Sequence, residues 1–376
     1  MEDTNEVDGI QEPTSNPNLK AKLKKAQENY DAIVNCPEGY IDVKLSTRGL
    51  ISECPESFRI RNFSPEDLMN LGLADREEVP IRLIKVLDSL IFNPNRNSAL
   101  SVENWHEKEV IELLLLLYET FYTTVFPNQE WIPTEEDWEY LKEIYGGPDS
   151  DEFRGRERAL KNKSWKPTFD IDISQLDYHE IPDDFKTKVK IDRKYGDKDF
   201  SAVFSLPKFG DFMKLKFFID DIYKEEDRQF ARIAEIYKFR KEAEDKILAG
   251  ENINIASVPN VPKAELDKYK EYETKKSLFA ITASKALYLQ EFDGEDLSRW
   301  PLVKKLDMAK DARLDYTTFK MVQDHFSKLK FGLKEEITVH DPILNKVVQR
   351  NYSFQLTDLL AAIRDSGAVQ TTVSYI

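Results

Sequence analysis

The chain has 376 residues, with 54 Lys and Arg against 69 Asp and Glu, which gives a formal net charge of −15. This acidic balance argues against broad binding along a nucleic-acid backbone, which requires clustered basic side chains. The longest apolar run, residues 113–117, is far shorter than the roughly 20 residues of a membrane span. We therefore expect a soluble protein that binds neither nucleic acid nor membrane. Hydrophobic residues make up 41%, enough for cores in two or three domains.

Residues 1–18 are acidic and nearly free of large apolar side chains. Such a segment cannot offset its ordering entropy, so we expect a disordered acidic tail that is dispensable for folding. The first residues are acidic where a secretory leader would be basic, and the default location is the cytoplasm. A short basic helix is predicted at 19–30, followed by extended segments at 40–45 and 58–61.

A helical period begins at Ser64, where Ser-Pro-Glu-Asp supplies a cap, a first-turn proline and first-turn acids. Helices are predicted at 64–72, 79–91, 102–125 and 134–145. The third has a middle that is apolar almost all round, which predicts burial by neighbouring elements. Residues 19–148 are therefore expected to form an N-terminal, mainly helical domain.

After residue 148 the alternation of apolar and polar residues predicts strands at 169–173, 189–191 and 200–206. Residues 149–210 are thus expected to form a small antiparallel β region. A long-helix region, 211–330, follows, with helices at 211–248, 262–290, 295–307 and 309–330 and a loop at 250–262. Residues 331–376 are expected to contain a hairpin, which pairs 335–340 with 347–354, and a short helix at 356–363. The fold class is α+β, mainly α-helical, with small antiparallel β elements in the middle and a C-terminal β-hairpin.

Residues with the spacing of a catalytic or metal site are missing from the sequence. His106, His179, His325 and His340 lack metal-ligand spacing, and Cys36 and Cys54 are 18 positions apart. No glycine-rich phosphate loop and no Gly-x-Ser-x-Gly motif occurs. Asp170 and Asp172 share a strand face and could act as an acid–base pair, but an outward-facing acidic strand side explains them better. Asp220-Asp221 and 225–227 are likewise better explained without catalysis, as a solvated helix surface or an N-cap region. We predict no catalytic, cofactor-binding or metal-binding residue, no cofactor, and no enzymatic activity.

The helix at 262–290 carries more apolar surface than one buried stripe needs. Most of this surface should be intramolecular core, and a minority should be available for another protein. The sequence does not separate the two groups, which together comprise Leu266, Tyr269, Tyr272, Leu278, Phe279, Ile281, Ala286, Leu287 and Leu289.

Several segments resemble one family in the same order along the chain. Val43-Lys44-Leu45-Ser46-Thr47-Arg48-Gly49 looks like a degenerate Leu-Pro-Ser-Lys/Arg-Gly segment, although Ser46 replaces its proline. Ile60 to Leu68, the helix ending in Phe92-Asn93-Pro94 and the apolar helix to Tyr122 follow. Lys166 to Ile173 and the Leu-Pro-x-x-Gly-Asp turn at 206–211 match the family's middle, and a hairpin without cysteines closes the chain. This order is similar to the baseplate hub assembly proteins of contractile-tailed bacteriophages, which are also grouped with tail-assembly chaperones.

The resemblance implies a non-enzymatic, chaperone-like assembly factor that binds other phage tail or baseplate proteins, such as the hub or the tape measure. It would act in the host cytoplasm during assembly. The alternative is a permanent structural component of the baseplate or tail tip, which would remain in the virion. A third alternative, from a different class, is an enzyme whose site gathers scattered carboxylates. Whether the chain forms an oligomer stays open.

Overall fold

The computed structural model describes residues 38–72, 79–161, 163–182, 185–248 and 259–373. The predicted acidic tail, the basic helix at 19–30, Cys36 and most of the loop at 250–262 lie outside these residues. Within them, the fold is α+β and mainly helical, with small antiparallel sheets and a C-terminal hairpin, as the sequence predicted. None of the described helices is both long and apolar enough to cross a bilayer.

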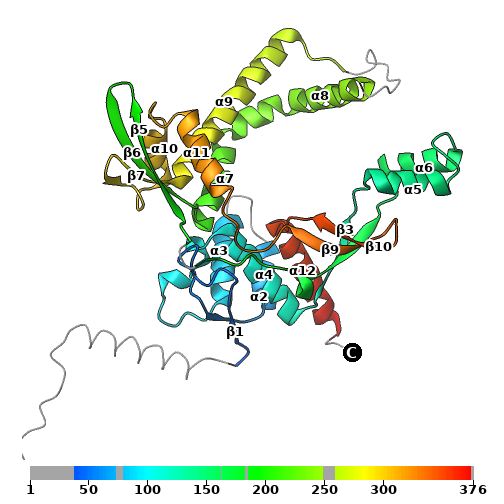
Figure 1. The fold of residues 1–376 in the computed structure, drawn as a ribbon, viewed down its shortest axis with the longest axis horizontal. Helices are drawn as coiled ribbons and strands as arrows, with labels where there is room; N and C mark the ends of the chain where they lie inside the picture. The colour runs from blue at the N-terminus through cyan, green and yellow to red at the C-terminus, as the bar shows by residue number, and fades with distance from the viewer. Residues whose placement is uncertain (1–37, 73–78, 162, 183–184, 249–258, 374–376) are drawn as a thin grey trace, which may run out of the picture.

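The elements follow one another along the chain in Figure 1. The helices are α2 (Pro65–Gly72), α3 (Val79–Leu90), α4 (Glu107–Phe121), α5 (Glu135–Ile144), α6 (Asp151–Lys161), α7 (Phe209–Ile222), α8 (Lys224–Leu248), α9 (Lys263–Tyr288), α10 (Leu302–Ala309), α11 (Tyr316–Phe326) and α12 (Leu356–Val373), with short 3-10 turns η1 (Ser98–Leu100), η2 (Val102–Asn104) and η3 (Ile173–Gln175). The strands are β1 (Ile41–Val43), β2 (Phe58–Ile60), β3 (Val125–Glu130), β4 (Thr168–Asp172), β5 (Lys188–Tyr195), β6 (Lys198–Ser205), β7 (Leu289–Phe292), β8 (Glu295–Asp296), β9 (Glu336–Asp341) and β10 (Lys346–Asn351).

All strand pairs in the described sheets are antiparallel. Strands β1–β2, β3–β4 and β9–β10 form two-stranded sheets, and β5-β6-β7-β8 forms a four-stranded sheet. In the C-terminal hairpin Val348 lies opposite Val339, and the turn between the strands contains Pro342. This pairing confirms the predicted hairpin.

Helix α4 is the centre of the largest core. Its N-terminus is fixed by a capping box, in which the His106 side chain accepts from the backbone of the first turn and the Glu109 carboxylate accepts from the His106 amide. The leucines at 113, 114, 115 and 117 are 0% exposed, which confirms the predicted burial. The hairpin and α12 complete this core through Phe354, Leu359 and Ile363.

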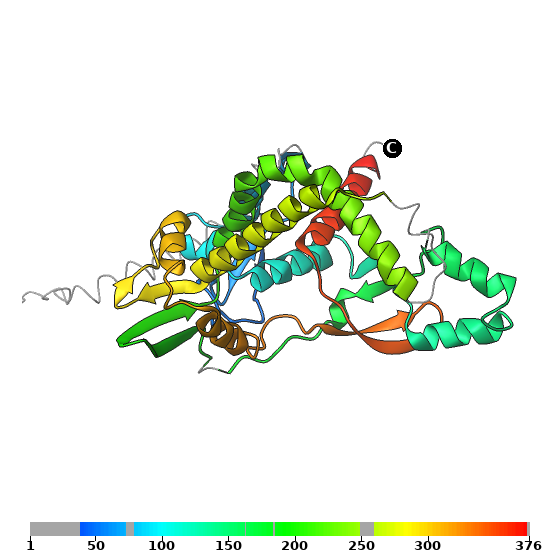
Figure 2. The same cartoon turned by 90° about the horizontal axis from the view of Figure 1, so that it is seen from above.

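A second core lies between the four-stranded sheet and α11. Phe200, Phe204 and Phe292 project from the sheet onto Phe319 and Val322 of the helix. Figures 1 and 2 show this unit at one end of the molecule, with the hairpin β9–β10 away from it. Two helical hairpins also project from the main core, α8–α9 and α5–α6, and we call them the long arm and the short arm.

Several predicted elements differ from the observed ones. The helix expected at 295–307 is observed only as α10 from Leu302, because residues 295–296 pair with β7 as strand β8, and the helix expected at 309–330 is observed at 316–326 as α11. The helix expected at 102–125 begins at Glu107, because the Asp88 carboxylate binds the backbone N–H of Val102 and the Ser101 hydroxyl and holds that segment in 3-10 turns. It ends at Phe121, and the chain continues as β3. The helix expected at 211–248 divides at Tyr223 into α7 and α8, and the last helix continues past 363 to Val373.

The segment 149–210, which the sequence assigned to one β region, contains helix α6, and its strands belong to two different sheets. Strand β4 pairs with β3, whereas β5 and β6 pair with each other. The helical period of α6 was missed because its sequence, DEFRGRERALK, has few apolar residues. Its fold depends on contacts such as the Arg156 guanidinium over the Trp165 ring, 4.9 Å from the centroid.

Candidate protein-binding surface

The long arm is held together by aromatic side chains between α8 and α9. Phe230 stacks on Tyr272 with centroids 5.0 Å apart, and Tyr237 meets Tyr269 edge-on at 5.8 Å. Positions 230, 233, 234 and 237 follow the three-and-four spacing of one helix face. The apolar residues of 230–237 are therefore core-face positions of the arm.

An ion pair fixes the base of the arm. Both oxygens of the Asp227 carboxylate accept from Lys276 Nζ, at 2.6 and 2.8 Å, and one of them also accepts from the Tyr272 hydroxyl. Burial opposes the ionisation of Asp227, but the hydrogen bonds from Lys276 and Tyr272 outweigh it and hold the pKa of the carboxyl below its usual value. The acidic run at 225–227 lies in the first turn of α8. Of the two alternatives that the sequence left open, this position agrees with the N-cap region, and Asp227 is ion-paired with Lys276.

The described residues leave the outward face of α9 uncovered. Leu278 is 60% exposed and Ile281 is 42% exposed, one helical turn apart. The other apolar residues singled out in this helix are buried or half-buried. The structure thus separates the two groups that the sequence left mixed.

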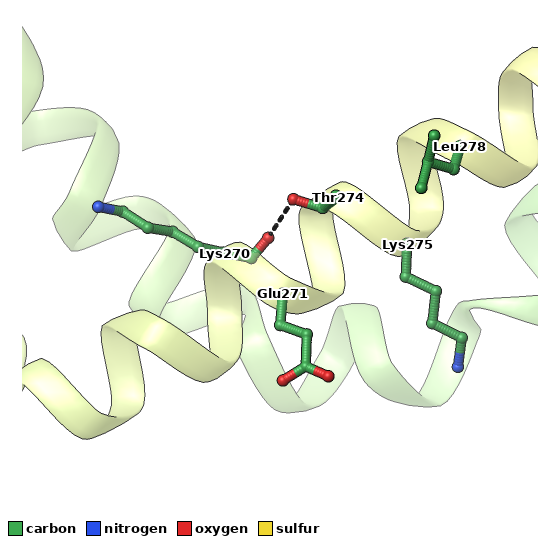
Figure 3. A pocket seen from close by; sticks show the side chains of 5 residues that line it. All are labelled: Lys270, Glu271, Thr274, Lys275 and Leu278. Carbon is green, nitrogen blue, oxygen red and sulfur yellow. Dashed lines mark hydrogen bonds between the residues drawn. The ribbon is translucent and has the colours of Figure 1, made fainter.

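A shallow depression of about 450 Å³ lies on this face, lined by Lys270, Glu271, Thr274, Lys275 and Leu278. All five side chains come from α9 alone (Figure 3). The Thr274 hydroxyl donates to the Lys270 carbonyl at 2.8 Å, a bond that commonly bends a helix. A depression on one helix face cannot enclose a small molecule, since small-molecule sites bury most of the ligand surface.

A second depression, of about 620 Å³, lies on the four-stranded sheet and was not anticipated from the sequence. Its lining includes the carboxylates of Asp192, Asp199 and Asp293. Each is within ion-pair distance of a basic group, respectively Lys190 at 3.1 Å, Lys194 at 4.0 Å and Arg313 at 2.5 Å. Hydrogen bonds from Ser201 and Lys190 hold the pKa of Asp192 below its usual value. Carboxylates paired in this way stabilise the sheet edge and are poorly placed to exchange protons with a substrate.

The residues considered as an acid–base pair have structural roles. Asp170 is exposed and accepts the backbone N–H of Asn128. Asp172 caps the turn η3 by accepting from Ser174 and Gln175. Phe169 and Ile171, which alternate with them along the strand, are buried. This agrees with the interpretation as an outward acidic side of a strand.

The four histidines do not come together. His106 is half-buried as the cap of α4, with its ring against Phe331. Burial and the Lys108 charge lower its pKa to about 4. His340 is exposed on β9. Among the described residues, no three His, Cys, Asp or Glu side chains are grouped so that they could hold a metal.

Two buried glutamates of α4 were also missed. Glu109 accepts the hydroxyls of Thr47, at 2.7 Å, and of Ser52, and Glu112 accepts the Ser46 amide at 2.5 Å and hydroxyl at 2.8 Å. Both carboxyls therefore fasten the loop at 46–52 to the central helix. A signal was present, because Glu112 interrupts an otherwise apolar run.

Cys54 lies in the same region. Burial raises the pKa of the Cys54 thiol, and Glu109 and Glu112 raise it further. The thiol therefore stays protonated and is a poor nucleophile.

Comparison of the chain with protein-family models, with curated proteins and with solved structures finds no match.

Proposed function

We propose that this chain is a non-enzymatic assembly factor that binds other proteins of a bacteriophage tail or baseplate through the long arm. The observation that carries the binding role is the exposed pair Leu278 and Ile281 on a helix that is anchored to the main fold on its opposite side. The assignment to a tail rests on the sequence resemblance of residues 43–122, 166–173 and 203–211 to baseplate hub assembly proteins.

The arm is built as a rigid support for a binding face. Aromatic contacts and the Asp227–Lys276 ion pair fix α8 against α9, so the outward side chains are presented on a preformed surface. A preformed surface lowers the entropic cost of association. Leu278 and Ile281 are positioned to act as apolar anchors, and Lys270 and Lys275 extend on either side of Glu271 at the polar rim (Figure 3).

The test compares partner capture by the parent chain and by Leu278→Glu in cells producing the virus that encodes it. Val303→Glu is the matched control, because Val303 is also an exposed apolar residue, at 57%, on another helix. We expect tail or baseplate proteins to co-purify with the parent and with Val303→Glu but not with Leu278→Glu. Equal capture by all three variants would contradict the proposed surface, and capture of no tail protein would contradict the function.

Mass spectrometry of purified particles then decides how the factor acts. A departing chaperone would be missing from the particle, and this is the expected result. Stoichiometric amounts in the particle would instead establish the alternative, a permanent component of the baseplate or tail tip.

A further inference from the structure

The short arm carries a second uncovered apolar face. On α5, Leu141 is buried and Trp138 packs edge-on against Phe153 of α6 at 5.9 Å. On another side of the same helix, Tyr140 is 40% exposed and Ile144 is 51% exposed. These two residues are four positions apart, so they lie on one face.

The charge of α5 is strongly negative. Its ten residues, EEDWEYLKEI, contain five acids and one Lys, a net of −4. Asp137 is buried, but the glutamates at 135, 136, 139 and 143 are exposed around Tyr140 and Ile144. Two of them are paired, Glu139 with Lys142 at 2.6 Å and Glu136 with Lys346, so four acids and two lysines give the exposed side a net charge of −2. The outward face of α5 is therefore apolar in its middle and acidic around it.

The outward face of α9 has the opposite charge. At the depression the exposed charged residues are Lys270, Lys275 and Glu271, which sum to +1. Lys276 and Lys285 turn inward, because their Nζ atoms bind the Asp227 carboxylate and the Leu314 carbonyl. The positive sum on this face contrasts with the net charge of −15 for the chain.

Both faces are exposed in the single chain, so α5 and α9 of one copy do not cover each other. Each copy carries one acidic and one basic apolar face. Two copies related by a two-fold axis can make the same contact twice, which closes the assembly. Opposite charges around an apolar pair set the register of such a contact and repel wrong partners.

We propose that a second copy of this chain occupies the α9 face, with the acidic face of α5 from each copy against the basic face of α9 from the other. The contact uses the surface assigned to the proposed function, and in that respect the inference rests on it. Self-pairing would cover the apolar anchors until a partner protein displaces the second copy.

The experiment measures the molar mass of the purified full chain by light scattering and its dimer dissociation constant by sedimentation. We expect a dimer that weakens as salt is raised, because exposed charges are screened. One variant, Lys270→Glu with Lys275→Glu, reverses the α9 face. The other, Glu139→Lys with Glu143→Lys, reverses the α5 face. Each alone places like charges opposite one another and should raise the dissociation constant by about 10- to 100-fold.

The decisive measurement is the molar mass of a mixture of the two variants. In a mixed dimer the reversed α9 face meets the reversed α5 face, and the two unchanged faces meet each other, so dimerisation should return. Lys320→Glu with Lys328→Glu, which makes the same charge change at exposed positions elsewhere, should leave the dimer intact. Circular dichroism of each variant checks folding.

A parent chain that stays monomeric at all concentrations and salt conditions would overturn the proposal, as would a mixture that stays monomeric when both variants are folded. Neither result touches the proposed function, which is measured separately by capture of tail proteins.

Discussion

The carboxyl groups of Asp137 and Asp341 meet in the junction between α5 and the C-terminal hairpin. They are 0% and 2% exposed, respectively, and each carboxyl shifts the pKa of the other. Asp137 Oδ2 accepts from Trp131 Nε1 at 3.0 Å and from the Thr134 amide at 2.7 Å, whereas Oδ1 has no hydrogen-bond partner among the described residues. Asp341 Oδ1 accepts two backbone N–H groups of its own turn. A proton on Asp341 would satisfy Asp137 Oδ1, and we expect the two carboxyls to share it.

We expect Asp341→Asn to stabilise this junction at alkaline pH. Burial raises the pKa of Asp341, and Asp137 raises it further. Burial opposes the ionisation of Asp137, but the Thr134 and Trp131 bonds lower its pKa. A carboxyl with a raised pKa in the folded state contributes stability at low pH that is lost as pH rises through that pKa.

The side-chain amide introduced by this substitution supplies the bridging hydrogen at every pH. The stability advantage of the variant should therefore grow from pH 4 to pH 8, reaching about 2 °C or more in melting temperature. Hydrogen exchange of β9 and β10 reports the same change locally. Other charged groups on these elements are Arg350, over the Trp131 ring at 4.0 Å, and the pair Glu136–Lys346. A variant advantage that does not depend on pH would contradict the shared proton.

Glu112→Gln should remove a pH dependence of folding stability that comes from a single buried carboxyl. Burial, opposed in part by the Ser46 hydrogen bonds, raises the pKa of Glu112 from 4.5 to about 7. The folded chain therefore gains stability below pH 4.5 and loses it as pH rises through 7. The glutamine still accepts from Ser46 and carries no charge, so it should be more stable than the parent at pH 8 by on the order of 1–3 kcal/mol. Denaturant unfolding at pH 5 and pH 8 tests this, with the exposed Glu152→Gln as a control that should match the parent at both.

Truncation of a buried leucine and of an exposed leucine should have different effects on stability. Leu117 is 0% exposed, so Leu117→Ala should cost about 2–5 kcal/mol of unfolding free energy. Leu278 is 60% exposed, so Leu278→Ala should change stability by no more than about 0.5 kcal/mol. Denaturant unfolding measures both changes. If Leu117→Ala proved as stable as the parent and failed to bind a partner, the α4 face would be an interface and not core.

Alanine substitution at two helix glycines should change the stability of the fold in opposite directions. A Cβ at Gly210, in the first turn of α7, would lie 2.3 Å from Glu103 Cγ and 3.0 Å from the Glu103 carbonyl oxygen. Gly210→Ala should therefore destabilise the packing of α7 on η2 by about 1–3 kcal/mol. A Cβ at Gly155 of α6 meets nothing within 4 Å, so Gly155→Ala should stabilise that helix by about 0.5–1 kcal/mol. Thermal unfolding of both variants provides the comparison, and equal signs would contradict it.

Removal of metal should leave the fold unchanged. The C-terminal hairpin holds its place through apolar and aromatic contacts, such as Phe354 with Tyr352 at 4.9 Å and with Phe126 at 5.6 Å. Circular dichroism before and after chelator, with metal analysis of the purified protein, checks this. One zinc per chain whose removal unfolds the hairpin would overturn it.

The sequence determined the parts of this protein that depend on local periodicity. The capped start of α2, the apolar run of α4 and the alternation of β9 and β10 each contain their own signal within about a dozen residues. The α+β class and the hairpin could be predicted for that reason. Helix α6 could not, because its contacts come from outside the helix, with Trp138 against Phe153 and Trp165 beneath the Arg156 guanidinium.

Only the tertiary structure decided which side of each helix is covered. Nothing in the spacing of α9 distinguishes Leu278 from Phe279, yet Phe279 packs against Tyr223 and Leu278 faces solvent. The same limit applies to the carboxyls of Asp137 and Asp341, which are 204 positions apart in the chain and meet only because the hairpin folds back onto α5. Burial and charge pairing are properties of neighbours in space, and a sequence specifies neighbours only along the chain.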